Sequence, residues 1–495
     1  MTTDGTDFFA RFRASLEAED PLALLAAGQI GEGVPVPGPF GAHPLVYADH
    51  VASGRALRQV EEAILGEVLP YYANSHSEAS FCGRHVSRLR EAARAEIARL
   101  CNAPGEFATI FTGAGATAGL NRLTRLLGVE AAARAGARPA VVIGPYEHHS
   151  NILPWRESGA EVIEVPEAAA GGPDLAALET ILESLRGRPV VGAFSAASNV
   201  TGILTDPDPV TRILRRHGAL AVWDYAGAGP YLEIDMRPGT DAEKDAVVLS
   251  PHKFLGGPGA SGLLIVRRGA VRISRPSQPG GGTVTFVSPW AEDYAGDVTR
   301  REEAGTPNVI GDIRAALALL VKDAAGTGRI AARHRVLRQR ALARWWRNPN
   351  IIILGGRAAA DSLPVFALMI RDAETGRPVH HQLFTRLLSD CHGIQARGGC
   401  ACAGPYAHRL LSIDARQSAA IRAAIRAGEE ARKPGWTRLS LSWLLDEAKA
   451  DFVIDAVDRL AREAPRLAAA YRMDPATARF VPAPVTDPAS RAPAA

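Results

Sequence analysis

Short apolar runs rich in β-branched residues alternate with helix-like patterns between residues 105 and 268. The runs that predict strands are PAVVIG (139–144), AEVIEV (160–165), PVVGAFSAA (189–197), LAVWDY (220–225), DAVVLS (245–250) and SGLLIV (261–266). Helix patterns lie between strands at 117–128, 174–187 and 208–218, and the last two end in glycine, which commonly stops a helix. This alternation predicts a mainly parallel sheet with helices on both faces.

The flanking patterns predict further helices and a second, smaller α/β domain. Helices are expected at 55–69, 86–100, 313–326, 329–347, 380–390 and 449–472. Two more strands are expected at 350–355 and 364–370. We divide the chain into an N-terminal segment (1–44), a large domain (45–320), a small domain (321–475) and a Pro- and Ala-rich tail (476–495) that we expect to be disordered.

Charge and composition limit the partners of the chain. There are 56 basic and 53 acidic residues, for a net charge of +3, and no long basic run indicates nucleic acid or an anionic membrane surface. The N-terminus has no apolar signal core, and no stretch stays apolar for long enough to span a bilayer. We expect a cytoplasmic protein with a small-molecule ligand and five reduced cysteines.

One lysine differs from the others in its setting. Lys253 lies in SPHKFLGGPG (250–259), between a strand-like apolar run and a cluster of glycines, whereas every other lysine has polar neighbours. Unlike arginine, lysine can lose its proton near neutral pH, and the free amine forms imines with carbonyl compounds. This residue therefore predicts a carbonyl-containing ligand.

Other chemically distinctive residues follow the strand ends, where ligands bind in open α/β sheets. Asp224 ends an apolar run, residues 115–117 form a small-residue turn that opens a helix, and His148 and Asn199 each follow a strand. Taken singly, such residues can be a cap, a tight turn or a satisfied core histidine. Together, a phosphate seat, a carboxylate, an imidazole and an imine-forming lysine describe a site for pyridoxal phosphate (PLP).

The motifs around these residues resemble those of a known family. EHHSNILPW (147–155), SNVTG (198–202), SPHKFLGGPG (250–259), PGGGTV (279–284), EEAGTPN (302–308) and RGGCACAGP (397–405) occur in the order found in class V PLP enzymes of fold type I. The chain most resembles the cysteine desulfurase and selenocysteine lyase branch, from VYADHVASG (46–54) to the final helix. The resemblance implies a seven-stranded-type, mainly parallel sheet between helices.

The resemblance also implies roles for individual residues at a PLP site. Lys253 forms the imine with PLP, Asp224 pairs with the pyridine nitrogen, and His148 stacks on the ring and takes part in catalysis. Asn199 lies against the cofactor. The residues implied at its phosphate are Ala116, Thr117, Ser250 and His252. The Gly280–Thr283 stretch reaches the phosphate of a neighbouring subunit, so a homodimer is implied.

A glycine-rich loop, ARGGCACAGPY (396–406), carries two cysteines. In the family, a cysteine follows an Arg-x-Gly-x-x pattern, and here that spacing selects Cys402, preceded by Arg397. The resemblance implies that the Cys402 thiolate takes sulfur from L-cysteine as a persulfide, releases alanine and passes the sulfur to an acceptor protein. Arg438, in WTRLSLSW (436–443), is implied to bind the substrate carboxylate together with Arg397.

Alternatives remain open for this loop and for the reaction. Cys400 and Cys402 can be inert small residues, part of a metal site with Cys391 and His392, or a local disulfide; we predict no metal. The chain can also be another class V aminotransferase, lyase or epimerase in which Cys402 is incidental, or a silent scaffold.

The sequence also departs from the family pattern. Gly227 stands where the family has a glutamine beside the cofactor, and Cys400 and Ala401 replace two histidines. The phosphate turn is one residue longer, and the segment from Cys402 to Arg438 is expanded.

Overall fold

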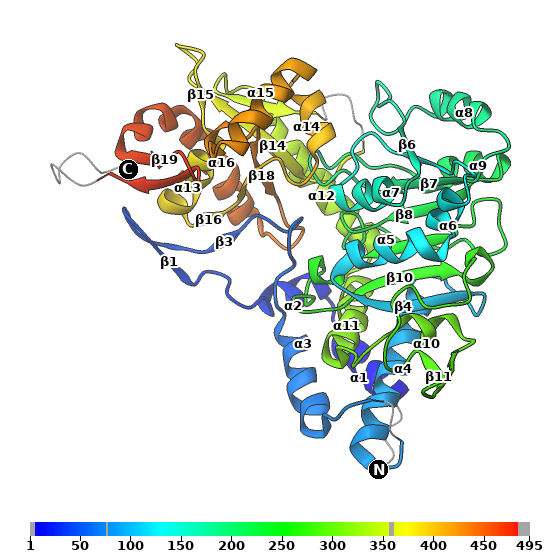
Figure 1. Ribbon diagram of the computed structural model, residues 1–495. Coiled ribbons are helices and arrows are strands. Elements are labelled where there is room, and N and C mark those ends of the chain that lie inside the picture. The colour runs from blue at the N-terminus through cyan, green and yellow to red at the C-terminus, as the bar shows by residue number, and fades with distance from the viewer. Residues whose placement is uncertain (1–4, 76–77, 356–360, 484–495) are drawn as a thin grey trace. The chain divides into compact units, whose positions relative to one another are not determined.

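A computed structural model of the chain describes residues 5–75, 78–355 and 361–483. These residues divide into two compact units (Figure 1). Unit 1 comprises the described residues of 1–30, 53–198 and 204–330, and unit 2 comprises those of 31–52, 199–203 and 331–495.

Unit 1 is built on a seven-stranded sheet in the order β4-β10-β9-β8-β7-β5-β6. Its strands are β4 (Phe107–Gly113), β5 (Ala140–Ile143), β6 (Glu161–Glu164), β7 (Val190–Ser195), β8 (Leu220–Asp224), β9 (Ala246–Leu249) and β10 (Gly262–Arg267). Strands β6, β5, β7, β8 and β9 pair in parallel, whereas β10 is antiparallel to both of its neighbours. The predicted fold class, with a mainly parallel sheet in the larger part, is confirmed.

The central strands of unit 1 are apolar on both faces because helices cover the sheet. Val222, Val248 and Leu264 are 0% exposed and pack in one cluster with Leu120 and Leu123. The helices of unit 1 are α1 (Gly5–Ser15), α2 (Pro21–Ala27), α3 (Arg58–Ala63), α4 (Phe81–Leu100), α5 (Gly115–Leu126), α6 (Val129–Arg134), α7 (Leu153–Glu157), α8 (Leu175–Ser184), α9 (Pro207–Arg216), α10 (Val298–Glu302) and α11 (Val309–Ala325). A hairpin of β11 (Val284–Val287) and β12 (Glu292–Tyr294) completes the unit.

Unit 2 has an antiparallel sheet in the order β13-β14-β18-β17, with β15 also paired to β14. Its strands are β1 (Pro35–Gly38), β2 (Gly41–Pro44), β3 (Val46–Tyr47), β13 (Ile351–Leu354), β14 (Val365–Arg371), β15 (Pro378–Val379), β16 (Ile394–Gln395), β17 (Arg397–Gly399), β18 (Trp436–Ser440), β19 (Tyr471–Asp474) and β20 (Arg479–Pro482). Its helices are α13 (His381–His392), α14 (Gly404–Leu410), α15 (Ala415–Arg426) and α16 (Glu447–Leu467), and α12 (Thr327–Trp345) leads into it from unit 1.

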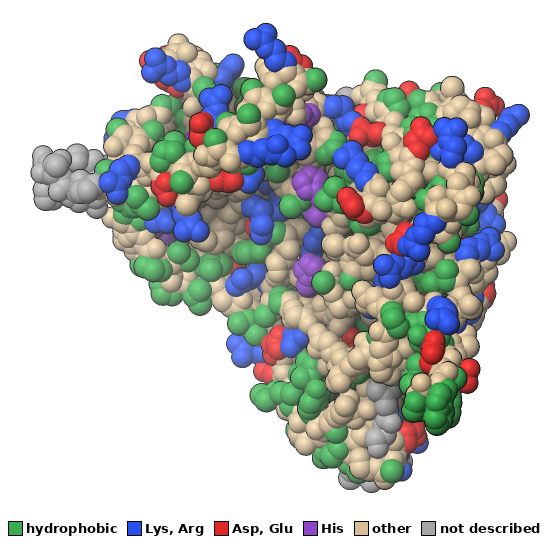
Figure 2. Space-filling view, in the orientation of Figure 1, with side chains coloured by type: hydrophobic (Ala, Val, Ile, Leu, Met, Phe, Trp, Pro, Cys, Tyr) green, Lys and Arg blue, Asp and Glu red, His purple; other side chains and the backbone are tan. Residues whose placement is uncertain are grey.

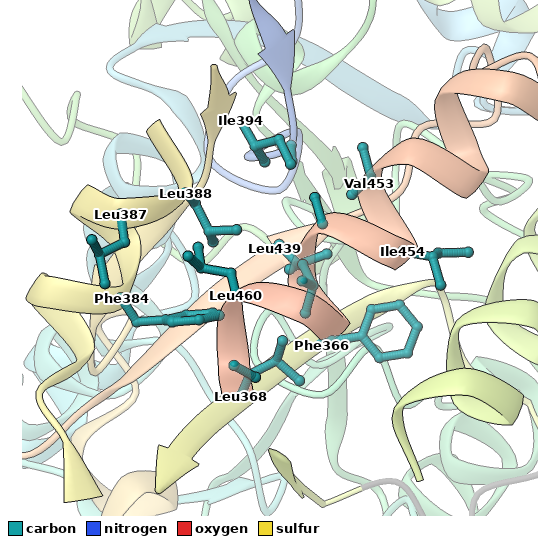
Figure 3. Close-up of a cluster of buried hydrophobic side chains, with 14 of the residues drawn as sticks. Phe366, Leu368, Phe384, Leu387, Leu388, Ile394, Leu439, Val453, Ile454 and Leu460 are labelled. Carbon is teal, nitrogen blue, oxygen red and sulfur yellow. The ribbon is translucent and has the colours of Figure 1, made fainter. Parts of the chain in front are cut away.

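One hydrophobic cluster holds unit 2 together (Figure 3). Phe366 and Leu368 of β14 and Leu439 of β18 pack against Phe384 of α13 and Leu460 of α16. Each of these side chains is at most 1% exposed. Full burial of such a side chain stabilises the folded state by about 1.5–3 kcal/mol, so this cluster fixes β18 and its neighbour β17 in place.

The structure differs from the sequence expectation in two segments. The helix expected at 55–69 is interrupted: α3 continues as a π-helix (Ile64–Val68), in which the Leu69 N–H bonds the Ile64 carbonyl. It ends in a 3₁₀ turn (Leu69–Tyr71) that contains Pro70, which has no N–H to continue a helix. In the segment expected to be a disordered tail, Arg479–Pro482 form β20, and Phe480 packs on the unit 2 core. Residues 484–495 of that tail lie outside the described residues. None of the helices described is both long and apolar enough to cross a membrane.

Candidate active site

The predicted cofactor residues of unit 1 gather at one edge of its sheet. Asp224 is the last residue of β8, Lys253 lies in a 3₁₀ turn (Pro251–Lys253) after β9, and His148 follows β5. β8 and β9 are adjacent, β7 lies between β8 and β5, and all of these strands run in parallel, so their carboxyl ends share an edge. β4 runs in the same direction as these strands, so the start of α5, which follows β4, lies at that edge as well.

Asp224 and Lys253 form an electrostatic pair at this edge. The Asp224 carboxyl group is buried, with the residue 4% exposed, and one of its oxygens accepts a hydrogen bond from the Ala226 N–H at 2.7 Å. Burial raises the pKa of Asp224, and the Ala226 hydrogen bond and the charge of Lys253 offset part of that rise. Burial and the charge of Lys253 together lower the pKa of the adjacent His252.

The turn before α5 forms a close-packed seat against Ser250 and His252. The Ala116 N–H, in the first turn of α5, donates to Ser250 Oγ at 3.0 Å. Gly115 has φ +59°, and a Cβ there would lie 2.9 Å from Ser250 Oγ and 3.0 Å from a His252 ring carbon. Only glycine fits this position. The N-cap residue, Ala114, makes no side-chain hydrogen bond to the helix start, which is suited to bind an anion.

Two other predicted residues, His148 and Thr117, are joined by a hydrogen-bonded chain. Ser150 Oγ lies 3.0 Å from His148 Nδ1 and 2.7 Å from Thr117 Oγ1. The Ser150 N–H also donates to His148 Nδ1 at 3.1 Å, so Nδ1 accepts and the imidazole is held in one orientation. The structure thus connects the predicted ring-stacking residue with the predicted phosphate residue through Ser150, which sequence reasoning did not select.

Glu147 is a second residue that sequence reasoning missed. It is 2% exposed, and its carboxyl oxygens accept hydrogen bonds from the Ser195 N–H and hydroxyl and from Asn151 Nδ2, at 2.5–2.8 Å. Burial raises the pKa of Glu147 to about 7 despite these bonds, and the nearby Asp224 charge adds to the rise. A glutamate at the end of an apolar run, directly before the chosen histidine, was the signal available in the sequence.

The Gly280–Thr283 stretch forms a separate, self-contained turn in unit 1. Thr283 is fully buried, and its hydroxyl donates to the Gly280 carbonyl at 2.6 Å. Its own carbonyl accepts from the Ala295 N–H at 2.8 Å. These contacts do not join Thr283 to the strand-end residues of the same unit.

Unit 2 holds the other predicted residues, Asn199, Arg397, Cys402 and Arg438. Arg397 and Arg438 are directly opposite each other on β17 and β18. Asp49 lies between them: one oxygen accepts from Arg397 Nε at 2.7 Å, and the other accepts from Arg438 Nη2 at 2.8 Å. Burial alone would lower the pKa of Arg397, but the hydrogen bond and charge of Asp49 raise it. Asp49 lies within VYADHVASG (46–54), and no local sequence pattern distinguishes it.

Cys402 lies in a strained turn between β17 and α14. Ala401 and Cys402 both have φ +54°, a left-handed backbone conformation that residues other than glycine rarely adopt. The Ala403 N–H donates to the Cys400 carbonyl at 3.2 Å, which closes the turn, and Asn199 Nδ2 donates to the Ala401 carbonyl at 2.8 Å. Cys402 is exposed, and its thiol interacts electrostatically with Arg397.

The remaining cysteines give no support to the disulfide or metal interpretations. All five cysteines are free, and Cys391 is buried in the unit 2 core, where burial raises the pKa of its thiol to about 12. Within the described part of the chain, no group of three or more His, Cys, Asp or Glu side chains is arranged to hold a metal ion.

The donor set of unit 1 fits PLP. At the start of α5, the close contact that admits only Gly115 and the Ala116 N–H that donates to Ser250 Oγ form a small polar seat suited to a phosphate. A buried carboxyl at Asp224 can face a ring nitrogen, and Lys253 supplies an amine at the same sheet edge. These three groups match the phosphate, pyridine nitrogen and aldehyde of the cofactor.

Curated proteins similar to this chain include several cysteine desulfurases. A probable cysteine desulfurase of Streptomyces coelicolor is 28% identical over 372 residues, which is 74% of this chain and 85% of the relative. A probable cysteine desulfurase of Vibrio cholerae is 29% identical over 367 residues, with 73% and 85% covered.

Solved structures with the same fold include two cysteine desulfurases. The apo enzyme of Thermococcus onnurineus has a TM-score of 0.69 at 22% identity and covers 84% of this chain and 95% of its own. The Escherichia coli cysteine desulfurase CsdA has a TM-score of 0.65 at 24% identity, with 85% and 94% covered. The profile of the aminotransferase class-V family, a family of PLP-dependent enzymes, matches residues 46–431. The chain belongs to the aminotransferase class-V family.

Proposed function

We propose that this protein is a PLP-dependent cysteine desulfurase that converts L-cysteine to L-alanine and carries the sulfur as a persulfide on Cys402. The observation that carries the proposal is the placement of Cys402, an exposed thiol in a strained turn of the same unit as the Asp49-linked arginines. The relatives named cysteine desulfurase support the same reaction.

The residues that would hold PLP are those at the sheet edge of unit 1. Lys253 would bind the aldehyde carbon, Asp224 the ring nitrogen, and the N–H groups at the start of α5 the phosphate, with Ser250 and His252 beside them. His148, held by Ser150, would lie against the ring. When bound, PLP accepts the electrons of the substrate Cα–H bond.

The side chains of the chain then have separate tasks. Lys253 moves the Cα proton, and the buried Asp224 keeps a negative charge opposite the ring nitrogen. The Arg438 guanidinium binds the substrate carboxylate. The Cys402 thiolate attacks the substrate sulfur: a new S–S bond forms, the Cβ–S bond breaks, and Cβ is protonated. The balanced reaction is L-cysteine plus the Cys402 thiol giving L-alanine plus the Cys402 persulfide, which a sulfur-acceptor protein would then take.

A homodimer is part of the proposal because unit 1 exposes an apolar hairpin. Phe286, Val287 and Trp290 are 54%, 62% and 90% exposed, directly after the Gly280–Thr283 turn. Figure 2 shows an apolar cluster over β11 on this face. Such a patch is suited to pack against a second copy. We expect light scattering to give the mass of a dimer, and Trp290→Asp to shift it toward the monomer.

The persulfide assignment is tested with paired cysteine variants. In Cys402→Ser, we expect PLP and L-cysteine still to bind but alanine release to fall by about 10³-fold or more, because a hydroxyl is a far poorer nucleophile toward sulfur. Cys400→Ser, two residues away in the same turn, should keep most of its activity. Mass spectrometry should find the persulfide on Cys402 of the wild type.

A persulfide on Cys400 would move the assignment by two residues. Full activity of both single variants and of the double variant would exclude a cysteine nucleophile and favour another class V reaction. Independently, borohydride reduction followed by peptide mapping should attach the pyridoxyl group to Lys253. A label on another lysine would overturn the cofactor site.

A further inference from the structure

Two arginines of unit 2 are forced together by the register of its sheet. Arg397 on β17 is the direct cross-strand partner of Arg438 on β18. Like charges in this arrangement repel and destabilise a sheet, so a local negative charge is needed. Arg438 is 4% exposed, which makes its charge costly to leave unpaired, whereas the Arg397 side chain is 55% exposed.

Asp49 is that negative charge, and its backbone is tied to both arginine segments. Ala48, its neighbour, donates to the Gln395 carbonyl at 2.9 Å and accepts from the Ser440 N–H at 2.7 Å. The His50 N–H donates to Ser440 Oγ at 3.0 Å. The residue is therefore held on both sides, and its two carboxylate oxygens each take one arginine.

The Arg438 guanidinium is fixed by these contacts in a single orientation. Nη2 donates to Asp49, and Nη1 donates to the Asn199 carbonyl at 3.1 Å. Two of its five N–H donors are used in this way, which leaves others for a ligand. Asn199 Oδ1, in the same cluster, is a buried acceptor with no hydrogen-bond partner among the described residues.

The net charge of Asp49, Arg397 and Arg438 determines the charge of the ligand that this cluster can bind. Two guanidinium groups and one carboxylate sum to a single positive charge, which balances one substrate carboxylate. We propose that Asp49 is a positioning and specificity-determining residue: it orients Arg438 and cancels one of two positive charges, so that the site prefers amino acids with an uncharged side chain over those with an anionic one. The proposal rests on the proposed function in taking Arg438 as the group that binds the substrate carboxylate.

Calorimetric binding of L-alanine and L-aspartate to the PLP-loaded protein tests this preference without turnover. The two ligands share a backbone and differ by one carboxylate. Wild type should bind L-alanine more tightly. In Asp49→Asn, the cluster gains one net positive charge, and the ratio of the L-aspartate to the L-alanine Kd should fall by about tenfold or more. With L-cysteine, the same variant should raise KM more than it lowers kcat.

Two further variants separate charge from position and from stability. Asp49→Glu keeps the charge but misplaces it, so both Kd values should rise while their ratio stays within about twofold of wild type. Asp458→Asn is the matched control: Asp458 is also buried in unit 2 and bridges two arginines, Arg344 and Arg462, elsewhere in that unit. It should leave the ratio unchanged.

The outcomes distinguish this proposal from the proposed function. If wild type releases alanine from L-cysteine but the Kd ratio of Asp49→Asn is unchanged, the specificity role is wrong and the desulfurase function stands. If wild type binds both amino acids but releases no alanine, the function is wrong and the ratio alone decides the role of Asp49. If Asp49→Asn does not fold, Asp49→Glu decides: a preserved ratio with both Kd values raised supports the proposal, and a changed ratio or unchanged Kd values overturn it. Wild type that binds neither amino acid overturns both.

Discussion

The two units build their candidate functional groups in opposite ways. In unit 1, each group follows a regular strand or opens the next helix, so the sheet itself brings Asp224, Lys253 and His148 to one edge. In unit 2, the register of β17 and β18 pairs Arg397 with Arg438. Asp49, Asn199 and Cys402 come from distant segments and join them through side-chain bonds and a strained turn. A site placed by regular structure should tolerate the loss of one bond, whereas a site placed by a few long-range bonds should not.

Among variants that keep Cys402, the largest effect is expected at Asp224. Asp224→Asn keeps the shape and the acceptor for the Ala226 N–H but removes the charge, and we expect alanine release to fall by about 10²- to 10³-fold while PLP remains bound. Absorbance of the bound cofactor and alanine release measure the two properties separately. A variant with normal turnover would show that Asp224 only caps its strand.

A pH effect of about 3 kcal/mol is expected at Glu147. Burial raises its pKa from the ordinary 4.5 to about 7, so the folded state binds more protons than the unfolded state between these values. The contribution of Glu147 to the free energy of unfolding is therefore highest below pH 4.5 and decreases as pH rises to about 7. Glu147→Gln removes this contribution, and its stability relative to wild type should improve by roughly 3 kcal/mol between pH 4.5 and 8.

Urea unfolding at several pH values measures this difference. Parallel pH curves for wild type and Glu147→Gln would contradict the raised pKa.

The share of the candidate site that the sequence could predict also differs between the two units. Strand periodicity and the residues directly after each strand located Asp224, Lys253 and the turn at 115–117, because parallel strands align their carboxyl ends. Glu147 was missed because its burial depends on bonds to Ser195 and Asn151, which no local pattern encodes.

The sequence predicts less of the candidate site in unit 2. Only the resemblance to family motifs indicates Cys402 and Arg438. The pairing of Asp49 with two arginines depends on contacts between residues that are 348 and 389 positions apart in the sequence. The left-handed turn was also unpredicted, since Ala401 and Cys402 are not residues that favour positive φ.

A smaller effect is expected from cutting the bond between Asn199 and the cysteine turn. Asn199→Ala loses the hydrogen bond to the Ala401 carbonyl, and a net bond energy of about 1 kcal/mol corresponds to a five- to tenfold slower formation of the Cys402 persulfide. Asn350→Ala is the control, because that amide donates to the Arg371 carbonyl elsewhere in unit 2. If Asn199→Ala instead loses PLP, the sequence-based role of Asn199 at the cofactor is favoured over its role in the turn.

The smallest effect is expected from relaxing the turn itself. Ala401→Gly places glycine at φ +54°, where its lack of a Cβ removes strain of about 1 kcal/mol, partly offset by the greater freedom of glycine in the unfolded chain. We expect a net stabilisation of a few tenths of a kcal/mol. The same substitution at Ala420, exposed in the middle of α15, should destabilise by about 0.5–1 kcal/mol, because there glycine relieves no strain. Urea midpoints of the two variants should therefore move in opposite directions, and a loss of stability in both would show that the turn stores no strain at Ala401. Since Cys402 keeps its own left-handed conformation in Ala401→Gly, persulfide formation should slow only if the strain at the preceding residue helps to hold the thiol in place.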